Sequence, residues 1–320
     1  MQGNPATPTN DFGNRNRHKA LTPFLDRLEE SRRKNLAQYE HRMRACMVLG
    51  IGLVWLYLQP LPATAEPLLV FIAENRKFFL LAGLLLLGDM VYSPLRNYQK
   101  AYKKVILPEM MQTFAGLNYR PDKTILPKRI LPSGLIDKKL TYVSDEYFWG
   151  GRHNILVEFA AVKMVDRIGR DPLTKKRPHN VFKGFYVTYQ LPKGVVGHTF
   201  ITMKNGTMNQ KMHRIRNELH NVNLNDATLE HFNIYTSDFK QAQQVISKPF
   251  LAKLTALSKL FGNSEIECSI YNNFVFITAP FVKEIFKDPD IHHPAFSSED
   301  IPFLQDATQQ ILEVVDTLPA

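Results

Sequence analysis

The chain has 320 residues, a net charge of +10, and 44% hydrophobic residues. Its two cysteines, Cys46 and Cys268, lie far apart in the sequence and indicate neither a disulfide framework nor a metal site. A basic excess suits either nucleic acid or an anionic membrane surface. The sequence contains no helix-turn-helix pattern, zinc finger or RNA-binding aromatic signature. We therefore favour the membrane surface, and nucleic acid is not the expected partner.

The N-terminal region before the first apolar segment divides into two parts. Residues 1–20 are rich in Asn, Pro, Thr and Gly, and we predict a disordered tail. Residues 21–44 are predicted to form a cytoplasmic amphipathic helix, with Thr22 as N-cap and Pro23 in its first turn. Its apolar stripe indicates either a helix lying on the membrane or a solvated helix that continues into the first span. The stripe consists of Phe24, Leu25, Leu28, Leu36 and Tyr39.

Two apolar segments follow, over 45–58 and 78–92. A helix rises 1.5 Å per residue, so a bilayer core of about 30 Å requires roughly 20 apolar residues. We therefore predict a transmembrane hairpin over 45–95, with spans at about 45–65 and 72–92. The alternative is a pair of buried helices in a large soluble core. A cleaved signal peptide is not expected, because about forty charged and polar residues precede the first segment.

The distribution of basic residues predicts the orientation of this hairpin. The link over 66–77 holds two bases and two acids, whereas bases dominate on both outer flanks. The positive-inside rule then places both termini, and everything after the second span, in the cytoplasm, and the link outside. The flanking bases are also expected to contact anionic headgroups of the cytoplasmic leaflet. They are Arg32, Arg33, Lys34, Arg42, Arg44, Arg96, Lys100, Lys103 and Lys104.

The remaining residues, 97–320, are predicted to form one α+β domain. About 220 residues are enough for one well-packed domain or two small ones. Helical spacing continues over 97–116, with a kink or restart at Pro108. Three prolines indicate an extended linker over 119–132, and a short helix or turn is expected over 133–136.

Strand signals dominate the middle of this domain. Residues 154–166 and 181–190 are rich in β-branched and aromatic side chains, and a charged loop connects them. A turn at 192–194 is expected to return the chain along 197–203, giving a three-stranded antiparallel meander. Another strand is predicted over 229–235.

The C-terminal part alternates helices and strands. Asp238 is expected to cap one long helix over 239–261, which Gly262-Asn263 would end. Strands over 265–271 and 274–279 are predicted to form a hairpin around Asn272-Asn273. A short helix over 281–286 and an amphipathic helix over 301–318 complete the domain. The class is α+β with an antiparallel sheet.

Several motifs in this domain occur in a characteristic order and spacing. They are the basic helix Tyr98–Met110, Tyr119-x-Pro121, Val181–Phe185, Gly197-His198-Thr199, Phe232–Asp238, then Ala242, Pro249-Phe250, Leu254 and finally Ile266–Pro280. In these features the chain over about 98–318 resembles the bacterial family DUF3137, whose function is unknown. Members typically carry two membrane spans ahead of the domain, so the resemblance implies a fold and a location but no activity.

Two positions depart from the pattern of that family. The family is expected to have an acidic residue with Leu before the Phe-x-x-Tyr run, and an acidic-Ala-Arg step in the helix that follows. This chain reads Leu229-Glu230-His231 and Gln241-Ala242-Gln243 there. If the acidic-basic pair were functional, this protein would lack half of it.

No catalytic or metal-binding motif is recognisable. His292-His293 and the pair His213 and His220 lack the further ligands of a metal site. Asp137, Asp145 and Glu146, near Trp149, indicate an acidic patch rather than an acid/base pair. The remaining candidates have ordinary structural interpretations: turn glycines at Gly150-Gly151, Gly194 and Gly197, no nucleophile elbow at Ser133-Gly134, and a solvated hairpin tip at Lys175-Lys176-Arg177 that could also touch headgroups.

These observations predict an integral inner-membrane protein whose cytoplasmic domain is a non-enzymatic interaction or scaffold module. The expected partners are the lipid bilayer with its anionic headgroups and an unidentified protein; no cofactor or metal is expected. Two alternatives remain at this point. One is a membrane-tethered hydrolase or nucleotide-dependent enzyme with an unrecognised site, and the other is a basic nucleic-acid-binding domain.

Overall fold

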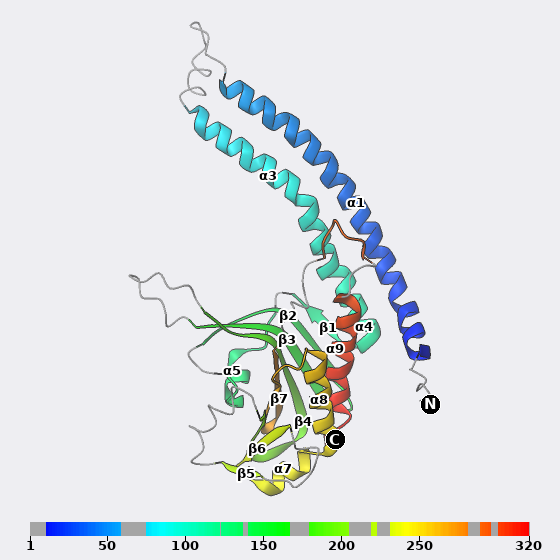
Figure 1. The fold of residues 1–320 in the computed structure, drawn as a ribbon, viewed down its shortest axis with the longest axis vertical. Coiled ribbons are helices and arrows are strands. Elements are labelled where there is room, and N and C mark those ends of the chain that lie inside the picture. Colours follow the sequence, from blue (N-terminus) through cyan, green and yellow to red (C-terminus); the bar gives the residue numbers. More distant parts are fainter. Residues whose placement is uncertain are drawn as a thin grey trace, which may run out of the picture. The chain divides into compact units, whose positions relative to one another are not determined.

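The computed structural model describes residues 11–58, 75–121, 123–136, 140–166, 179–204, 219–222, 231–280, 289–295 and 300–319. The chain forms two compact units. The first comprises Met1–Ile106 together with Asp288–Ser298, and the second comprises Leu107–Lys287 together with Glu299–Ala320. The first unit is helical, and the second contains the sheet (Figure 1).

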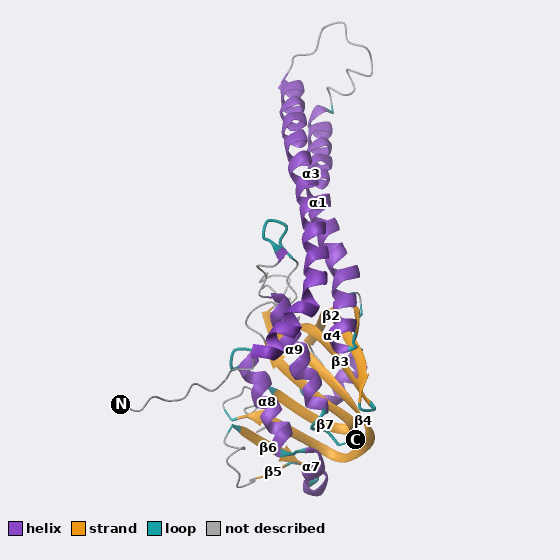
Figure 2. Ribbon diagram, turned by 90° about the vertical axis from the view of Figure 1, so that its right-hand side faces the viewer, coloured by secondary structure: helices purple, strands orange, loops and turns teal. Residues whose placement is uncertain are grey.

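The first unit is built on two long helices, α1 (Asp11–Leu58) and α3 (Arg76–Ala101), which run side by side (Figures 1 and 2). Small residues let the two helices approach closely. A Cβ added to Gly83 would lie 3.0 Å from a methyl group of Leu53, and one added to Gly50 would lie 4.0 Å from Leu87. The thiol of Cys46 also lies 3.7 Å from the Leu87 carbonyl oxygen.

Helix α1 differs from the predicted N-terminal region. It begins at Asp11, so residues 11–20 of the expected disordered tail are helical, while residues 1–10 lie outside the described part. Pro23 lies inside the helix rather than in its first turn. A proline removes one backbone hydrogen bond, but the helix can continue on both sides of it. The prediction took Pro23 as the start of a helix and did not allow for this.

Helix α3 continues through a π-helical turn over Tyr102–Ile106 into α4 (Leu107–Ala115). The predicted irregularity at Pro108 therefore takes the form of a wider turn ahead of the proline. Proline has no N–H to donate, and the wider turn shifts the hydrogen-bonding register just before that position. Gly116, in the left-handed region at φ +63°, follows the end of α4.

The second unit contains one seven-stranded, wholly antiparallel sheet with order β1-β2-β3-β4-β6-β5, and β7 also pairs with β4. The predicted α+β class with an antiparallel sheet is confirmed. The strands are β1 (Asn118–Arg120), β2 (Leu140–Arg152), β3 (Ile155–Asp166), β4 (His179–Met203), β5 (His220–Val222), β6 (Phe232–Thr236) and β7 (Glu267–Pro280).

Two predicted turns are instead bends within long strands. β4 passes through 192–194 without reversing, and β7 passes through Asn272 at φ +54°. Their pairing register shifts together there, with Val195 opposite Asn272. The expected meander is therefore correct for β3 and β4 and wrong for 197–203, which pairs with β6 and β7. A β-bulge and a tight turn favour the same types of residue, so composition alone does not distinguish between them.

Strand β2 was not predicted, and the nearby turn was misplaced. Gly150 and Gly151 lie in the strand, and the reversal into β3 occurs at His153-Asn154, both with positive φ. Gly150 is needed for close packing, because a Cβ there would lie 2.6 Å from a Leu117 methyl group. β1 likewise occupies part of the expected linker.

Different elements cover the two faces of the sheet (Figure 1). On one face lie α8 (Lys248–Leu260) and α9 (Asp300–Val315), where the Tyr189 hydroxyl donates to the Ile311 carbonyl at 2.9 Å. The other face packs against α5 (Pro127–Ile130) and the 3-10 turn Leu131–Ser133. Its core includes Ile130, Leu135, Tyr147, Tyr186, Phe200 and Phe276.

The expected long helix over 239–261 is divided in two. α7 (Phe239–Val245) ends before Ser247, which caps α8 by accepting from the Phe250 N–H at 3.2 Å. The predicted cap at Asp238 is present, accepting from the Gln241 N–H at 3.1 Å. The predicted helix over 281–286 and the tip at 175–177 lie outside the described residues.

Candidate functional site

Large apolar side chains are exposed on both helices over residues 43–58 of α1 and 78–92 of α3. We call this the far half of the α1/α3 pair, and the part before Arg42 on α1 and after Ser93 on α3 the near half. On α1 the exposed fraction reaches 71% at Ile51 and 62% at Trp55; on α3 it reaches 69% at Leu86 and 68% at Phe78. An exposed apolar surface of this kind marks contact with lipid or with another protein. The members on α1 are Met43, Met47, Val48, Leu49, Ile51, Val54, Trp55 and Leu58; those on α3 are Phe78, Phe79, Leu81, Leu84, Leu85, Leu86, Met90 and Tyr92.

Charged side chains mark where this apolar half ends. Arg42 of α1 donates to the Met90 carbonyl of α3 at 3.3 Å and to the Ser93 hydroxyl. Asp89, an acid near the C-terminal end of the predicted second span, pairs with Arg96 about two helical turns further along α3. The polar boundary of the two helices therefore lies at the same level on both.

By length and composition, one helical segment in the described part, Lys77–Ala115, is able to cross a membrane. It contains most of the predicted second span. The predicted first span reaches beyond Leu58 into residues that the structure does not describe, and the described part of α1 is not such a segment. The two-span hairpin is thus not confirmed.

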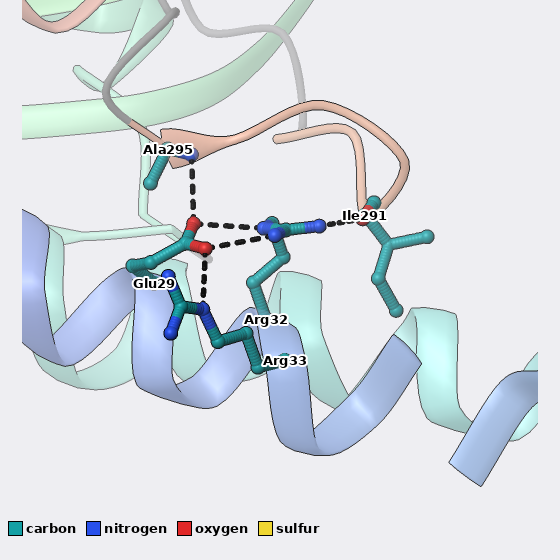
Figure 3. A network of polar contacts seen from close by, with 5 residues as sticks. All are labelled: Glu29, Arg32, Arg33, Ile291 and Ala295. Atoms are coloured by element: carbon teal, nitrogen blue, oxygen red, sulfur yellow. Dashed lines mark hydrogen bonds and ion pairs between the residues drawn. The ribbon is translucent and has the colours of Figure 1, made fainter. Parts of the chain in front are cut away.

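The near half of the α1/α3 pair carries a buried polar network (Figure 3). Glu29 accepts from Arg32 through both carboxylate oxygens at 2.8 Å, and from Arg33 at 2.9 Å. The same carboxylate accepts from the backbone N–H of Ala295 at 3.1 Å, while Arg32 donates to the Ile291 carbonyl at 2.9 Å. The network therefore fastens the segment 289–295 to α1, across more than 250 residues of sequence.

The surroundings of Glu29 favour its charged form. Its hydrogen bond from Arg32 is the largest of several effects that together lower its pKa to about 2, against the opposing effect of burial. Glu29 also raises the pKa of Arg32 through the same bond. Both side chains are buried, so the loss of either one would leave the charge of the other buried without a partner.

The nine bases predicted to bind headgroups differ in their exposure and in their contacts. Arg32 is buried in the Glu29 network and is not available to a headgroup, which corrects the prediction for this residue. Arg33 is 75% exposed although it also contacts Glu29. Arg42 joins α1 to α3, and Arg96 pairs with Asp89 within α3. Lys34, Arg44, Lys100 and Lys104 are exposed, and Lys103 is half-buried.

On the α5 side of the sheet, a second buried carboxylate lies among aromatic rings. Glu158 accepts from the Tyr147 hydroxyl at 2.5 Å and from the Thr188 hydroxyl at 3.3 Å, and it pairs with Arg129. Glu146, predicted to belong to an acidic patch, is buried and accepts from the Tyr119 hydroxyl. Both acids thus have structural partners among the described residues.

His198 contacts Ser269 on the same face of the sheet. Its Nε2 lies 2.8 Å from the Ser269 hydroxyl and 3.2 Å from the Ser133 carbonyl oxygen, between the rings of Phe200 and Tyr271. Ser269 is fully buried, so this pair does not present a nucleophile to a substrate. The histidine instead ties the turn at Ser133-Gly134 to the sheet. Desolvation by burial lowers the pKa of His198, against a smaller opposing effect of the Ser133 carbonyl.

This lowered pKa predicts a pH-dependent stability of the second unit. The unfolded chain binds a proton at His198 more readily than the folded one, so stability is full above about pH 6.5 and falls as the pH decreases below it. We expect His198→Phe to flatten the dependence of the melting temperature between pH 7.5 and 5.5. His231→Gln, a change at an exposed histidine, should leave the wild-type slope; equal slopes in all three proteins would contradict this assignment.

Among the described residues, no group of three or more His, Cys, Asp or Glu side chains is placed to hold a metal ion. The adjacent His292 and His293 lie on the segment that Glu29 fastens. The His292 N–H donates to Asp290 at 2.9 Å, and the His293 Nδ1 lies 2.8 Å from the same carboxylate. His213 lies outside the described part, and His220 lies in β5.

Comparison with known proteins agrees with the resemblance seen in the sequence. The model of the family DUF3137, described as a protein of unknown function, matches residues 180–319, so the suspected family is confirmed over this part of the chain. No curated protein matches the chain at a significant level. One solved structure, of the mycobacterial trehalose monomycolate transport factor A (TtfA), aligns with 67% of this chain and 96% of its own, at 9% identity and a TM-score of 0.35. A likeness at that level does not bear on function.

Proposed function

We propose that this chain, with its DUF3137 match over 180–319, is an integral protein of the bacterial inner membrane. In this proposal, the far half of the α1/α3 pair is a transmembrane hairpin. The sheet-containing unit is a cytoplasmic, non-enzymatic interaction module. The observation that supports the anchor is the exposure of large apolar side chains on both helices beyond Arg42 and Ser93.

The length of the apolar half suits a bilayer. From Arg42 to Leu58, and from Arg76 to Tyr92, each helix rises about 25 Å at 1.5 Å per residue. This approaches the roughly 30 Å of a hydrocarbon core. Trp55 and Tyr57 lie at the far end of α1, where aromatic side chains are favoured at the interface.

The alternative of two buried soluble helices agrees less well with the side chains. The most apolar 18-residue stretch of Lys77–Ala115 is only 11% buried. A soluble core would cover such side chains, because burying a Leu or Ile stabilises a protein by about 1.5–3 kcal/mol. Lipid provides this cover without a further protein layer, which is why we prefer the membrane.

The assignment of an interaction module rests on what the polar residues do. Glu146, Glu158, His198 and Ser269 each hold a structural contact in the second unit, and the network at Glu29 fastens a segment of the first. These polar groups are thus used to hold the fold. This favours a binding role over the enzymatic alternative.

Two measurements test this proposal. A fluorescent reporter fused after Ala320 should be active, because the proposal puts the C-terminus in the cytoplasm. A phosphatase inserted in the link 66–77 should also be active, because that enzyme works only outside the cytoplasm, where the proposal puts the link. Replacing both Leu81 and Leu85 with Arg should move the chain out of the carbonate-resistant membrane fraction, because each Arg at mid-depth costs about 2.5–3.5 kcal/mol. The same double change at the exposed, polar positions Gln112 and Thr113 is the control. Release of the unchanged chain by carbonate would overturn the anchor.

A specific partner is the test of the interaction role. In-cell crosslinking of the full chain, followed by purification in detergent, should recover the same protein partner in repeated experiments. Substitutions confined to the second unit should abolish this recovery while the chain remains in the membrane. Recovery of no reproducible partner would contradict the scaffold assignment.

A further inference from the structure

One exposed surface of the second unit combines basic, aromatic and apolar side chains and is not used in any contact described so far. It is formed by described residues between β1 and α5, within 120–121 and 123–128, and by Trp149 of β2. We call it the Trp149 patch; its members are Arg120, Lys123, Leu126, Lys128 and Trp149. Figure 1 shows α5 beside the sheet, on the side away from α8 and α9.

Two cations are held over the indole ring of Trp149. The Arg120 guanidinium lies 5.9 Å from the ring centroid, and the Lys123 ammonium lies 5.5 Å from it. Below the surface the ring stacks on Tyr147 at 5.2 Å, and Tyr147 is in turn bonded to Glu158. The indole is therefore a fixed, half-exposed platform that gathers positive charge on the outside of the sheet.

The charges of this patch are not balanced by the surrounding described residues. Arg120, Lys123 and Lys128 are exposed and make no ion pair with a described carboxylate. Arg129, by contrast, is committed to Glu158. The sequence of the segment 120–129 has a single acid, Asp122, against four bases. The patch is thus complementary to an anionic partner.

Leu126 indicates which kind of anionic partner fits. Its side chain is 65% exposed at the turn between Lys123 and Lys128, where its carbonyl accepts from the Arg129 N–H at 2.8 Å. An exposed Leu beside a half-exposed Trp, with Lys and Arg around both, suits the headgroup region of a bilayer, where apolar and anionic groups occur in one layer. A single nucleic-acid strand would favour free aromatic faces for stacking, but cations already lie over this indole.

We infer that the Trp149 patch is a second membrane contact, in which Leu126 and Trp149 enter the headgroup layer of an anionic leaflet and Arg120, Lys123 and Lys128 bind lipid phosphates. This inference rests on the proposed anchor, which keeps the patch close to lipid. It adds a lipid-dependent position of the second unit: docked on anionic membrane and released from neutral membrane. Each exposed base contributes about a fivefold preference for the docked state.

The two tryptophans of the chain allow the anchor and the patch to be tested separately. Trp55 and Trp149 are the only ones. The full chain with Trp55→Phe, reconstituted in lipid nanodiscs, reports Trp149 alone. We expect brominated lipids labelled near the headgroup to quench Trp149 in discs with about 30% phosphatidylglycerol, which imitates an anionic leaflet. Trp149 should stay unquenched in discs of phosphatidylcholine alone.

Charge reversal provides the matched comparison. In the same background, Lys123→Glu with Lys128→Glu should remove most of the quenching, because two bases are lost and two acids are added. Lys193→Glu with Lys240→Glu makes the same change of net charge at exposed lysines elsewhere in the second unit and should preserve it. Equal effects of the two pairs would overturn the inference, since they would show a general charge effect.

A third protein, Trp149→Phe, reports Trp55 in the hairpin. Quenching of Trp55 in both kinds of disc together with no quenching of Trp149 would overturn the patch and leave the anchor standing. No quenching of either would contradict the anchor itself. Binding of an acidic peptide or an oligonucleotide in neutral discs, abolished by the Lys123/Lys128 pair, would assign the patch to that partner and overturn the lipid contact.

Discussion

Replacing Glu29 with alanine is expected to release the segment 289–295 from α1. The change removes the carboxylate that holds Arg32, Arg33 and the Ala295 N–H together. Arg32 would remain buried without its partner, which typically costs about 3–5 kcal/mol. Amide hydrogen exchange should show faster exchange at Ile291–Ala295, and limited proteolysis should cut the chain there.

Two further variants separate this effect from a general loss of helix stability. Glu30→Ala changes the neighbouring, exposed acid on the same helix and should leave exchange in the segment unchanged. Glu29→Met combined with Arg32→Met removes both charges together, so no charge is left buried. It should restore part of the protection lost in Glu29→Ala. Unchanged exchange in Glu29→Ala would show that the segment is held by its apolar residues, Ile291 and Ala295, alone.

The same contact predicts behaviour in acid. The folded chain holds the pKa of Glu29 at about 2, below its usual value of 4.5, and this difference corresponds to about 3 kcal/mol. Because the folded pKa is the lower one, the stabilisation is present above pH 4.5 and is lost as the pH falls toward 2. Protection of the segment should therefore be constant from neutral pH to about pH 5 and weaken only in stronger acid.

The local elements of this fold were largely predictable from the sequence. Asp238 signals the start of α7, the amphipathic pattern marks α9, and β-branched runs mark β3 and β4. Each depends on a few neighbouring residues, which is the range over which propensity and periodicity act.

The features that failed all depend on distant partners. β2 carries Asp145 and Glu146 in its middle and does not resemble a strand, yet Glu146 is buried because Tyr119 of β1 donates to it. The bends of β4 and β7 are set by each other, through the pairing of Val195 with Asn272. A turn signal was present at both places, but only the pairing decides between reversal and bulge.

The candidate surfaces show the same division. The apolar halves of α1 and α3 are visible as composition, so their position was predicted. The Glu29 network was not, because its partners Ile291 and Ala295 contribute backbone atoms that carry no sequence signal. The Trp149 patch was missed for a related reason: its cations meet the indole only because β1 pairs beside β2, with Asn118 opposite Trp149.

Gly184→Val is expected to have the largest effect on the second unit. Gly184 lies in the middle of the sheet where β4 pairs with β7, opposite Pro280. A Cβ at this position would lie 2.7 Å from the Pro280 Cα and would also contact the Ala279 carbonyl oxygen. Both atoms belong to the backbone, so the clash is not relieved by a side-chain rotation. We expect a loss of more than about 3 kcal/mol in the free energy of unfolding, measured by urea denaturation in detergent.

The control is another glycine of the same strand. Gly194 lies in the bend of β4, and a Cβ there would meet no atom within 4 Å. Gly194→Ala should therefore be neutral, or stabilise slightly because the unfolded chain becomes less flexible. If both variants were destabilised equally, the bend would need glycine for its backbone conformation. If Gly184→Val were neutral, β4 and β7 would not pair as closely as described. A selective loss at Gly184 would show that β4 and β7 pair closely as far as Pro280, since only that pairing brings the β7 backbone against this position.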